Sequence, residues 1–249
     1  MGGHSKWANI KHRKAAQDSK KGKVWTKCSR EITIAAKIGG GKVDTNPRLR
    51  KAIEDARATN MPADNIKRAV QKGTGEIPGA VYEEVTMEGY GPGGVAVYCE
   101  GTSDNRNRTT NEVRRIFELG GGNMGSQGCV AFLFEKRGVI TVAPEAMAED
   151  ALIELALELG ADDVRSDASG HEVLTSQQAF EAVRDGLKAK GLTPASAEVA
   201  MVPKTSITVD RSQAEKNLKL IDALEEHDDV ANVYANFDIP DEVMAALAK

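Results

Sequence analysis

The chain has 249 residues, with 33 Lys and Arg against 37 Asp and Glu, which gives a formal net charge of −4. Hydrophobic residues make up 41% and aromatic residues only 4%, so we expect globular cores built mainly from aliphatic side chains. No apolar run approaches the length of a membrane-spanning helix, and no apolar segment typical of a secretory signal is present, so we expect a cytoplasmic protein.

Basic residues gather near the start of the chain. Residues 1–30 contain nine Lys or Arg, one acidic residue and both tryptophans, Trp7 and Trp25. Residues 1–75 carry a net charge of +12, whereas residues 76–249 carry −16. Lys and Arg neutralise phosphates, and an aromatic ring offers a face on which a base can stack. The pattern favours nucleic-acid contact over a merely solvated tail, because disordered tails seldom hold large aromatic side chains.

Residues 20–75 predict three short helices packed as a bundle. Apolar residues recur at helical spacing in the first helix, which a glycine run at 39–41 ends. Asn46 is the expected N-cap of the second helix, with Pro47 at its first position, and the third spans about 62–73. The outer faces of the three helices carry ten basic residues: Lys27, Arg30, Lys37, Arg48, Arg50, Lys51, Arg57, Lys67, Arg68 and Lys72.

Strand patterns begin beyond a predicted linker at Gly73–Ala80, which is rich in glycine. Residues 81–88 and 95–100 predict a hairpin across Gly89–Gly94. This turn matches GxGxxG, but strand residues follow it where the dinucleotide-binding motif requires a helix, so we interpret it as a turn. A helix is expected over 105–119.

The rest of the chain predicts two α/β units. The glycine-rich loop Gly120–Gly128 leads to an expected strand over Val130–Phe134. Residues 138–203 then follow the order strand, helix, strand, strand, helix, strand, which is the ferredoxin-like split βαβ pattern. A last helix over 212–226 and a strand over 230–237 complete the unit that began before the insertion.

These elements predict an α+β fold with an N-terminal three-helix bundle and two ferredoxin-like α+β domains, one inserted in the other. The basic arm and bundle are expected over 1–77, the discontinuous domain over 78–136 plus 205–249, and the inserted domain over 137–204. The acidic remainder of the chain is expected to keep the molecule soluble and to repel a polyanion from the wrong face.

No arrangement of residues predicts catalysis. The four histidines stand at no metal-ligand spacing, and the three cysteines are far apart with no CxxC, which is typical of reduced thiols. Paired acids such as Asp228 and Asp229 are expected at helix ends and turns, where solvated charge is the usual explanation. We therefore expect a protein that is not an enzyme, with no cofactor and no metal site.

Two segments of the middle region have open interpretations. Arg106 and Arg108 stand at a predicted helix start, where they could contact phosphates or form ordinary salt bridges to Glu112 and Glu118. The loop Gly120–Gly128 could let the backbone approach a ligand closely, or it is a mobile connection between a helix and a strand.

The chain also resembles a known family. The opening GHSKWANIKHRKAAQD and the later segments NPRLRKAI, NMPADNI, EGYGPGGVA and TSDNRNRT are similar to the YebC/PmpR family of transcriptional regulatory proteins. The resemblance covers essentially the whole chain and implies a helical N-terminal domain, two α+β domains and a DNA-binding regulatory role. The family includes the mitochondrial translational activator of cytochrome c oxidase, and some members are connected with translation on the ribosome. The chain departs from the pattern at Gly3, where many relatives carry alanine, and at Ser103.

We therefore expect a transcriptional regulator that binds DNA through its basic arm and helical domain. The alternative is a ribosome-associated translation factor or translational activator that binds RNA. No membrane partner is expected, and the oligomeric state stays open between a monomer and a weak dimer. The expected nucleic-acid-binding residues are Lys6, Trp7, Lys11, His12, Arg13, Lys14, Lys20, Lys21, Lys23, Lys27, Arg30, Arg106 and Arg108.

Overall fold

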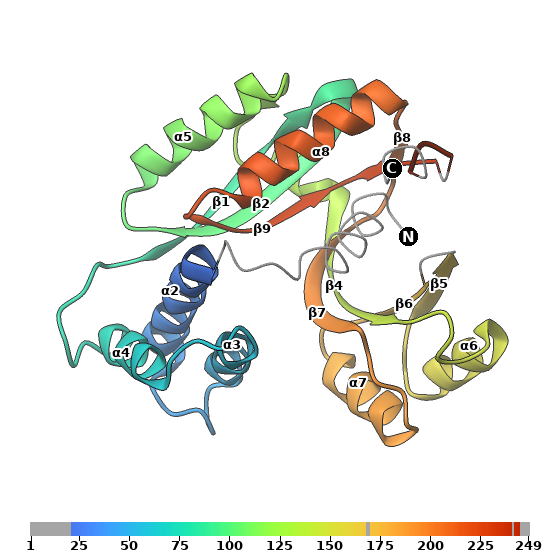
Figure 1. Cartoon of the computed structure of the whole chain (residues 1–249), viewed down its shortest axis with the longest axis horizontal. Coiled ribbons are helices and arrows are strands. Elements are labelled where there is room, and N and C mark those ends of the chain that lie inside the picture. The colour runs from blue at the N-terminus through green and yellow to red at the C-terminus, as the bar shows by residue number, and fades with distance from the viewer. Residues whose placement is uncertain (1–20, 168–169, 241, 245–249) are drawn as a thin grey trace. The chain divides into compact units, whose positions relative to one another are not determined.

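The computed structural model of the chain contains helices packed with β-sheets, which confirms the α+β class (Figure 1). The described residues are 21–167, 170–240 and 242–244. They fall into two compact units, one made of 21–129 and 216–233 and the other of residues within 130–215 and 234–244. Among the described residues, no helix combines the length and the apolar character needed to cross a bilayer.

The predicted three-helix bundle opens the first unit. Its helices are α2 (Lys21–Gly39), α3 (Pro47–Ala58) and α4 (Ala63–Thr74). Trp25 packs against the bundle core, and its indole N–H donates to the Thr59 carbonyl at 3.1 Å. The buried residues of this core are mainly aliphatic: Ile32, Ala35, Leu49, Ile53, Ala56, Ile66 and Ala69.

Asn46 joins the ends of two helices. Its Oδ1 accepts a hydrogen bond from the Leu49 N–H at 3.0 Å, which makes it the predicted N-cap of α3. Its Nδ2 donates to the carbonyls of Ala35 and Gly40, each at 2.8 Å. The side chain is buried, so these backbone groups find in it the partners that water cannot supply. One residue therefore starts α3 and closes α2.

The linker begins later than predicted. Gly73 lies inside α4, where an added Cβ would stand 2.3 Å from the Thr33 carbonyl oxygen, so glycine here allows α2 and α4 to pack closely. Gly75 ends the helix in the left-handed conformation, with φ at 79°, as C-cap glycines commonly do. The linker therefore starts at Gly75.

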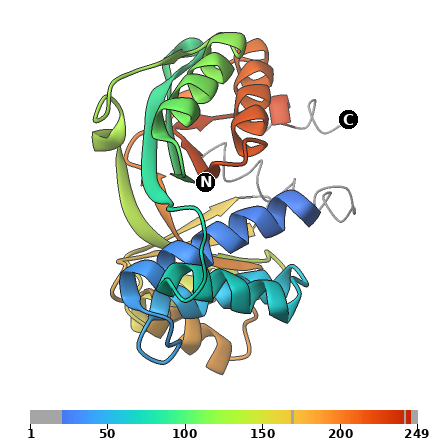
Figure 2. The same cartoon turned by 90° about the vertical axis from the view of Figure 1, so that its left-hand side faces the viewer.

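A four-stranded sheet in the order β3-β1-β2-β9 follows the bundle. Helices α5 (Arg106–Leu119) and α8 (Arg211–Glu225) lie side by side on one face of it (Figure 2). The predicted hairpin is present, and its turn holds Gly93 and Gly94 at positive φ, which confirms that GxGxxG is a turn here. The strands are β1 (Glu83–Gly91), β2 (Val95–Ser103), β3 (Asn123–Met124) and β9 (Val230–Ala235).

This sheet has the layout of a ferredoxin-like sheet, but its strands occur in a different order along the chain. Strand β2, helix α5 and strand β3 form a split β-α-β unit with β1 between the two strands. Strand β1 precedes this unit as the first arm of a hairpin, instead of following it. The sheet receives its last strand, β9, only after the second sheet has been completed in sequence.

The second unit has the predicted βαββαβ order. Its sheet, in the order β5-β6-β4-β7, is antiparallel throughout and matches the ferredoxin-like arrangement. Helices α6 and α7 pack on one face over a buried aliphatic core that includes Ile140, Leu152, Val173 and Leu187. The elements are β4 (Phe134–Val142), α6 (Glu149–Glu158), β5 (Asp163–Asp167), β6 (Gly170–Thr175), α7 (Phe180–Ala189) and β7 (Ser196–Pro203).

The predicted strand over Val130–Phe134 is wrong. A 3₁₀ turn occupies Ala131–Leu133, and the Leu133 N–H donates to the Val130 carbonyl at 2.9 Å. Val130 is buried and Phe132 is 63% exposed, whereas residues i and i+2 of a strand would lie on the same face, so the burial pattern also differs from that of a strand.

Strand β4 runs without a break from Phe134 to Val142, and the predicted junction between residues 136 and 137 falls inside it. The division into three domains with these boundaries remains a prediction. A short parallel pair, β8 (Ile207–Thr208) and β10 (Phe237–Asp238), completes the second unit.

Candidate nucleic-acid interface

Part of the predicted contact set lies outside the described residues: Lys6, Trp7, Lys11, His12, Arg13, Lys14 and Lys20. The same holds for the side chain of Lys21, the first residue of α2. The role of the arm therefore remains a prediction. The described members of the set are Lys23, Lys27, Arg30, Arg106 and Arg108.

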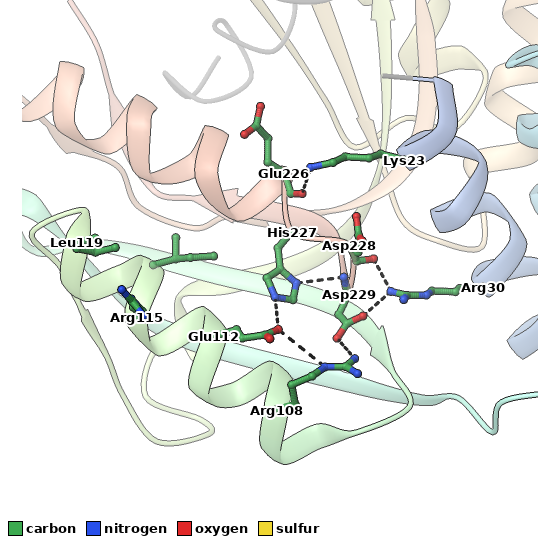
Figure 3. A pocket seen from close by; sticks show the side chains of 11 residues that line it. Lys23, Arg30, Arg108, Glu112, Arg115, Leu119, Glu226, His227, Asp228 and Asp229 are labelled. Atoms are coloured by element: carbon green, nitrogen blue, oxygen red, sulfur yellow. Dashed lines mark hydrogen bonds and ion pairs between the residues drawn. The ribbon is translucent and has the colours of Figure 1, made fainter. Parts of the chain in front are cut away.

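Three of these residues form one stripe along α2. Lys23, Lys27 and Arg30 follow one another at intervals of four and three residues, which places them on the same face of the helix. We call them the basic stripe. Their side chains reach the last turn of α8 and residues 226–229, which we call the α8–β9 turn. Figure 3 shows the contacts of Lys23 and Arg30.

Each side chain of the basic stripe donates to a main-chain carbonyl: Lys27 to the last residue of α8, and Lys23 and Arg30 to the α8–β9 turn. The last carbonyls of a helix lack partners within it and carry the negative end of its dipole, so cations there satisfy both the hydrogen bonds and the charge. Burial lowers the pKa of Lys27, and the carboxylates of Glu225 and Asp228 oppose this effect. The pairs are Lys23 with Glu226 at 3.2 Å, Lys27 with Glu225 at 2.6 Å and Arg30 with Asp228 at 2.6 Å.

Asp229 is the buried anion of the site, with a side chain only 3% exposed. Its Oδ1 accepts from Arg30, and its Oδ2 accepts from Arg108 at 2.9 Å and from the Thr109 hydroxyl. Burial alone would raise the pKa of this carboxyl, but the hydrogen bonds from Thr109 and Arg108 and the charge of Arg30 outweigh it, so the pKa lies below its ordinary value. The interpretation of Asp228 and Asp229 as solvated charges is therefore wrong for Asp229.

Strand β2 holds the backbone of Asp229 in place. The Thr102 N–H donates to the Asp229 carbonyl at 2.8 Å. A Cβ at Gly101 would stand 2.0 Å from the same oxygen, so only glycine permits this approach. The Ser103 hydroxyl lies 2.7 Å from that of Thr109 and joins the strand to α5. The carboxylate is thus positioned by a strand, a turn and a helix.

His227 completes the network. The Asp229 N–H donates to Nδ1 of His227 at 3.1 Å, so the ring carries its proton on Nε2, which faces Glu112 Oε2 at 2.9 Å. Glu112, His227 and Asp229 lie close enough to surround a metal ion. Both oxygens of Asp229, however, already accept hydrogen bonds from other side chains, so the arrangement favours an internal ion-pair network.

A cavity of about 670 Å³ opens beside this network, between α2, α5 and the α8–β9 turn (Figure 3). Its lining contains both cations and acids, and it also includes Leu119, which is 78% exposed. Such a surface favours contact with charged groups. The lining residues that matter here are Lys23, Arg30, Arg108, Glu112, Arg115 and Asp229.

The two predicted contact arginines of α5 differ in their surroundings. The helix begins at Arg106, as expected, and this side chain is exposed and forms no ion pair within the described part of the chain. Arg108 instead pairs with Asp104 at 2.8 Å and with Asp229 at 2.9 Å. Arg108 also lies 3.9 Å from the predicted partner Glu112, but its closer salt bridges are with two residues that were not predicted. Its buried partner lies 121 residues further along the chain, beyond the reach of local patterns.

Other cations of the bundle remain available. Lys51 pairs with Asp55, and Arg50 donates to the carbonyls of Val43 and Asp44. Four other exposed basic residues of α3 and α4 form neither an ion pair nor a side-chain hydrogen bond within the described residues. They stood among the ten predicted outer-face residues but not in the predicted contact set. Their exposure on two consecutive helices was the signal that could have selected them: Arg57, Lys67, Arg68 and Lys72.

The loop Gly120–Gly128 makes its close approach to β1. An added Cβ at Gly122 would stand 2.5 Å from the Tyr90 carbonyl oxygen. The Gly125 N–H donates to the Glu88 carbonyl at 2.8 Å, and the Gly128 N–H donates to the carboxylate of the same residue at 2.7 Å. The glycines of this loop therefore allow its backbone to pack against β1.

Two family models match the chain. The model described as the TACO1/YebC protein N-terminal domain matches residues 5–76, and the one described as the TACO1/YebC second and third domain matches residues 82–237. Together they span the bundle, both sheets and the charge network.

Relatives match over their full length. Two proteins named "probable transcriptional regulatory protein" cover all of this chain and all of their own, one from Dictyoglomus turgidum at 58% identity and one from Syntrophus aciditrophicus at 55%. The crystal structure of a conserved hypothetical protein from Aquifex aeolicus has the same fold, with a TM-score of 0.80 and 46% identity over 90% of this chain and 92% of that one.

Proposed function

Because the chain belongs to the TACO1/YebC family, we propose that it is a regulator of gene expression that binds DNA through its basic arm and its helical bundle. The printed names of its relatives support a regulatory role. The steep separation of charge supports an anionic partner for the first 75 residues, which carry +12 in a molecule of net −4. Binding of this kind needs no catalytic group and no cofactor.

The observation that carries the proposal is a set of exposed cations on α3 and α4 that form no ion pair with any of the described residues. Lys67, Arg68 and Lys72 lie on α4, and Arg57 lies near the end of α3. The two helices are joined by the four residues 59–62, a connection of the length found in helix-turn-helix motifs. A cation that forms no ion pair with the described residues breaks none of those pairs when it binds phosphate. Phosphate contacts at these residues should therefore cost the least free energy.

An in vitro test uses a labelled DNA duplex of about 20 base pairs and the full chain. The variant Lys67→Ala/Arg68→Ala should bind more weakly, and the slope of log K against log salt should shrink by about 0.9 for each lost phosphate contact. Lys51→Ala is the matched control, because its exposed ammonium already pairs with Asp55. Equal effects of the variant and the control would contradict contact through α4.

A second test asks which nucleic acid the protein meets in cells. Crosslinking followed by sequencing of both bound DNA and bound RNA should give peaks at promoters. Peaks confined to ribosomal RNA would contradict the DNA proposal and assign the protein to translation instead.

A further inference from the structure

The cations of the basic stripe of α2 belong to the predicted contact set, and they already form hydrogen bonds within the protein. All three cations of the stripe donate to the end of α8 or to the α8–β9 turn, and Arg30 also pairs with the buried carboxylate of Asp229. The acceptors are a row of main-chain carbonyls followed by one carboxylate. These oxygens accept hydrogen bonds from cations as phosphate oxygens do, and the carboxylate adds a full negative charge.

We propose that the α8–β9 turn is an internal competitor of nucleic acid, which covers the basic stripe and leaves it when phosphates take its place. The inference rests on the proposed function, because it assigns Lys23, Lys27 and Arg30 to the same nucleic-acid surface as the arm and α4. In the covered state described here, the exposed acids Glu226 and Asp228 add negative charge beside the stripe and repel a polyanion.

The contacts differ in how readily they can be exchanged. Lys23 is exposed and its carbonyl contact is the longest of the three, at 3.2 Å, so its ammonium can turn to a phosphate at little cost. Lys27 is half-buried, and its contact is shorter, at 2.6 Å. Arg30 shares the buried Asp229 with Arg108, so it is released only when the whole turn departs. Release of Arg30 therefore marks complete displacement of the turn.

The first test weakens the competitor at Asp229. Asp229→Asn removes the charge that holds Arg30, and a folded variant should bind a labelled 20-base-pair DNA duplex at least about threefold more tightly. Its salt slope should steepen by about 0.9, the value for one added phosphate contact. Asp104→Asn is the matched control, because Asp104 also pairs with Arg108 and loses one negative charge, but it has no contact with α2 among the described residues.

A diffuse electrostatic effect would raise the affinity of both variants alike and leave their salt slopes equal, and this outcome would overturn the proposal. A folded Asp229→Asn protein with unchanged or weaker binding would overturn it as well. Circular dichroism at 20 °C establishes whether the variant is folded.

The second test needs no variant and decides the matter if Asp229→Asn does not fold. Amide hydrogen exchange of the peptide covering residues 224–231 is measured in the wild-type chain with and without the duplex. Competition predicts faster exchange on binding, because the end of α8 and the turn lose the three contacts from α2 that hold their carbonyls in place. Unchanged or slower exchange would overturn the proposal.

These results separate the two levels of inference. Wild-type binding that depends on Lys67 and Arg68 but leaves the turn protected would sustain the proposed function and reject the competitor. Binding by Asp229→Asn when the wild type shows none would establish the competitor in its strongest form. Absence of binding by both proteins would reject both proposals.

Discussion

Asp229 is the residue at which the cations of two helices converge. Arg30 comes from α2 and Arg108 from α5, and both point their guanidinium groups at one carboxylate that water hardly reaches. A buried charge of this kind is stable only while it is paired, so removal of either partner costs more than an exposed ion pair would. The pair also positions the α8–β9 turn.

Acid should weaken the molecule through Asp229. Its pKa is lowered in the folded state, so its contribution to the free energy of unfolding is present above the unfolded pKa of about 3.9 and is lost as pH falls further. Urea unfolding followed by circular dichroism should show stability falling from pH 5 to pH 2 in the wild type. Asp229→Asn should be less stable at pH 7 and show a flatter dependence in acid. An identical pH profile in both proteins would contradict this role.

Trp7 allows a test of stacking that leaves charge unchanged. The predicted contact of its ring with a base is worth about 1–3 kcal/mol, so Trp7→Ala should bind single-stranded RNA at least about fivefold more weakly, with the same salt slope. The loss should be smaller for duplex DNA, whose bases hide their faces. Trp7→Phe keeps a ring and should restore most of the affinity. Fluorescence anisotropy measures the affinities of the wild type and both variants. Equal, negligible losses of affinity for RNA and DNA in Trp7→Ala would reject stacking.

At the scale of the element, helix ends decide how the bundle closes. The capping of α3 and the last carbonyls of α2 depend on the single side chain of Asn46. The end of α8 is served in the same way by the basic stripe of another helix. Both cases show a helix terminus satisfied by a neighbour, which ties two elements together as well as finishing one.

Substitutions at Asn46 should separate its two roles. Asn46→Ala loses the cap, the donor to the buried carbonyl of Ala35 and the donor to the carbonyl of Gly40, so we expect a loss of about 2–4 kcal/mol in the free energy of unfolding. Asn46→Asp keeps an acceptor for the Leu49 N–H but cannot donate to Ala35 and Gly40. Urea unfolding should place the Asp variant between the wild type and the Ala variant. Equal stability of Asp and wild type would contradict the donor role.

At the scale of the whole molecule, charge is divided between the basic first 75 residues and the acidic remainder. The linker that follows α4 separates the two compositions. Residues 78–81 have no regular secondary structure, and Val81 is 73% exposed, so this segment offers an accessible site for proteolysis.

Elastase, which cuts after small residues, should therefore cleave first after Ala80 or Val81. The fragment that follows carries most of the acidic residues and should bind duplex DNA weakly. Mass spectrometry of the early digest identifies the site, and anisotropy measures the fragment. A first cut elsewhere would contradict the exposure argument, and tight binding by the fragment would move the interface to Arg106 and its neighbours.

The sequence by itself determined the element types, the α+β class and the separation of charge. Asn46, Pro47 and the glycine turns were readable because caps and turns depend on neighbouring residues, and the βαββαβ order followed from alternating local patterns. The strand over Val130–Phe134 failed because a short apolar run does not distinguish a strand from the 3₁₀ turn that forms there. The residues of the arm stay predictions, since they lie outside the described part of the chain.

Only the tertiary structure decided which cations are already engaged. The spacing of the basic stripe is the same whether its cations bind phosphates or bind the end of another helix. Local sequence therefore cannot distinguish the two roles. Their acceptors lie about 200 residues away, as the separations of 203 and 198 for the lysine contacts show. Burial of Asp229 likewise depends on β2, α5 and α8 coming together, and it turns an apparently solvated acid into the anchor of the network.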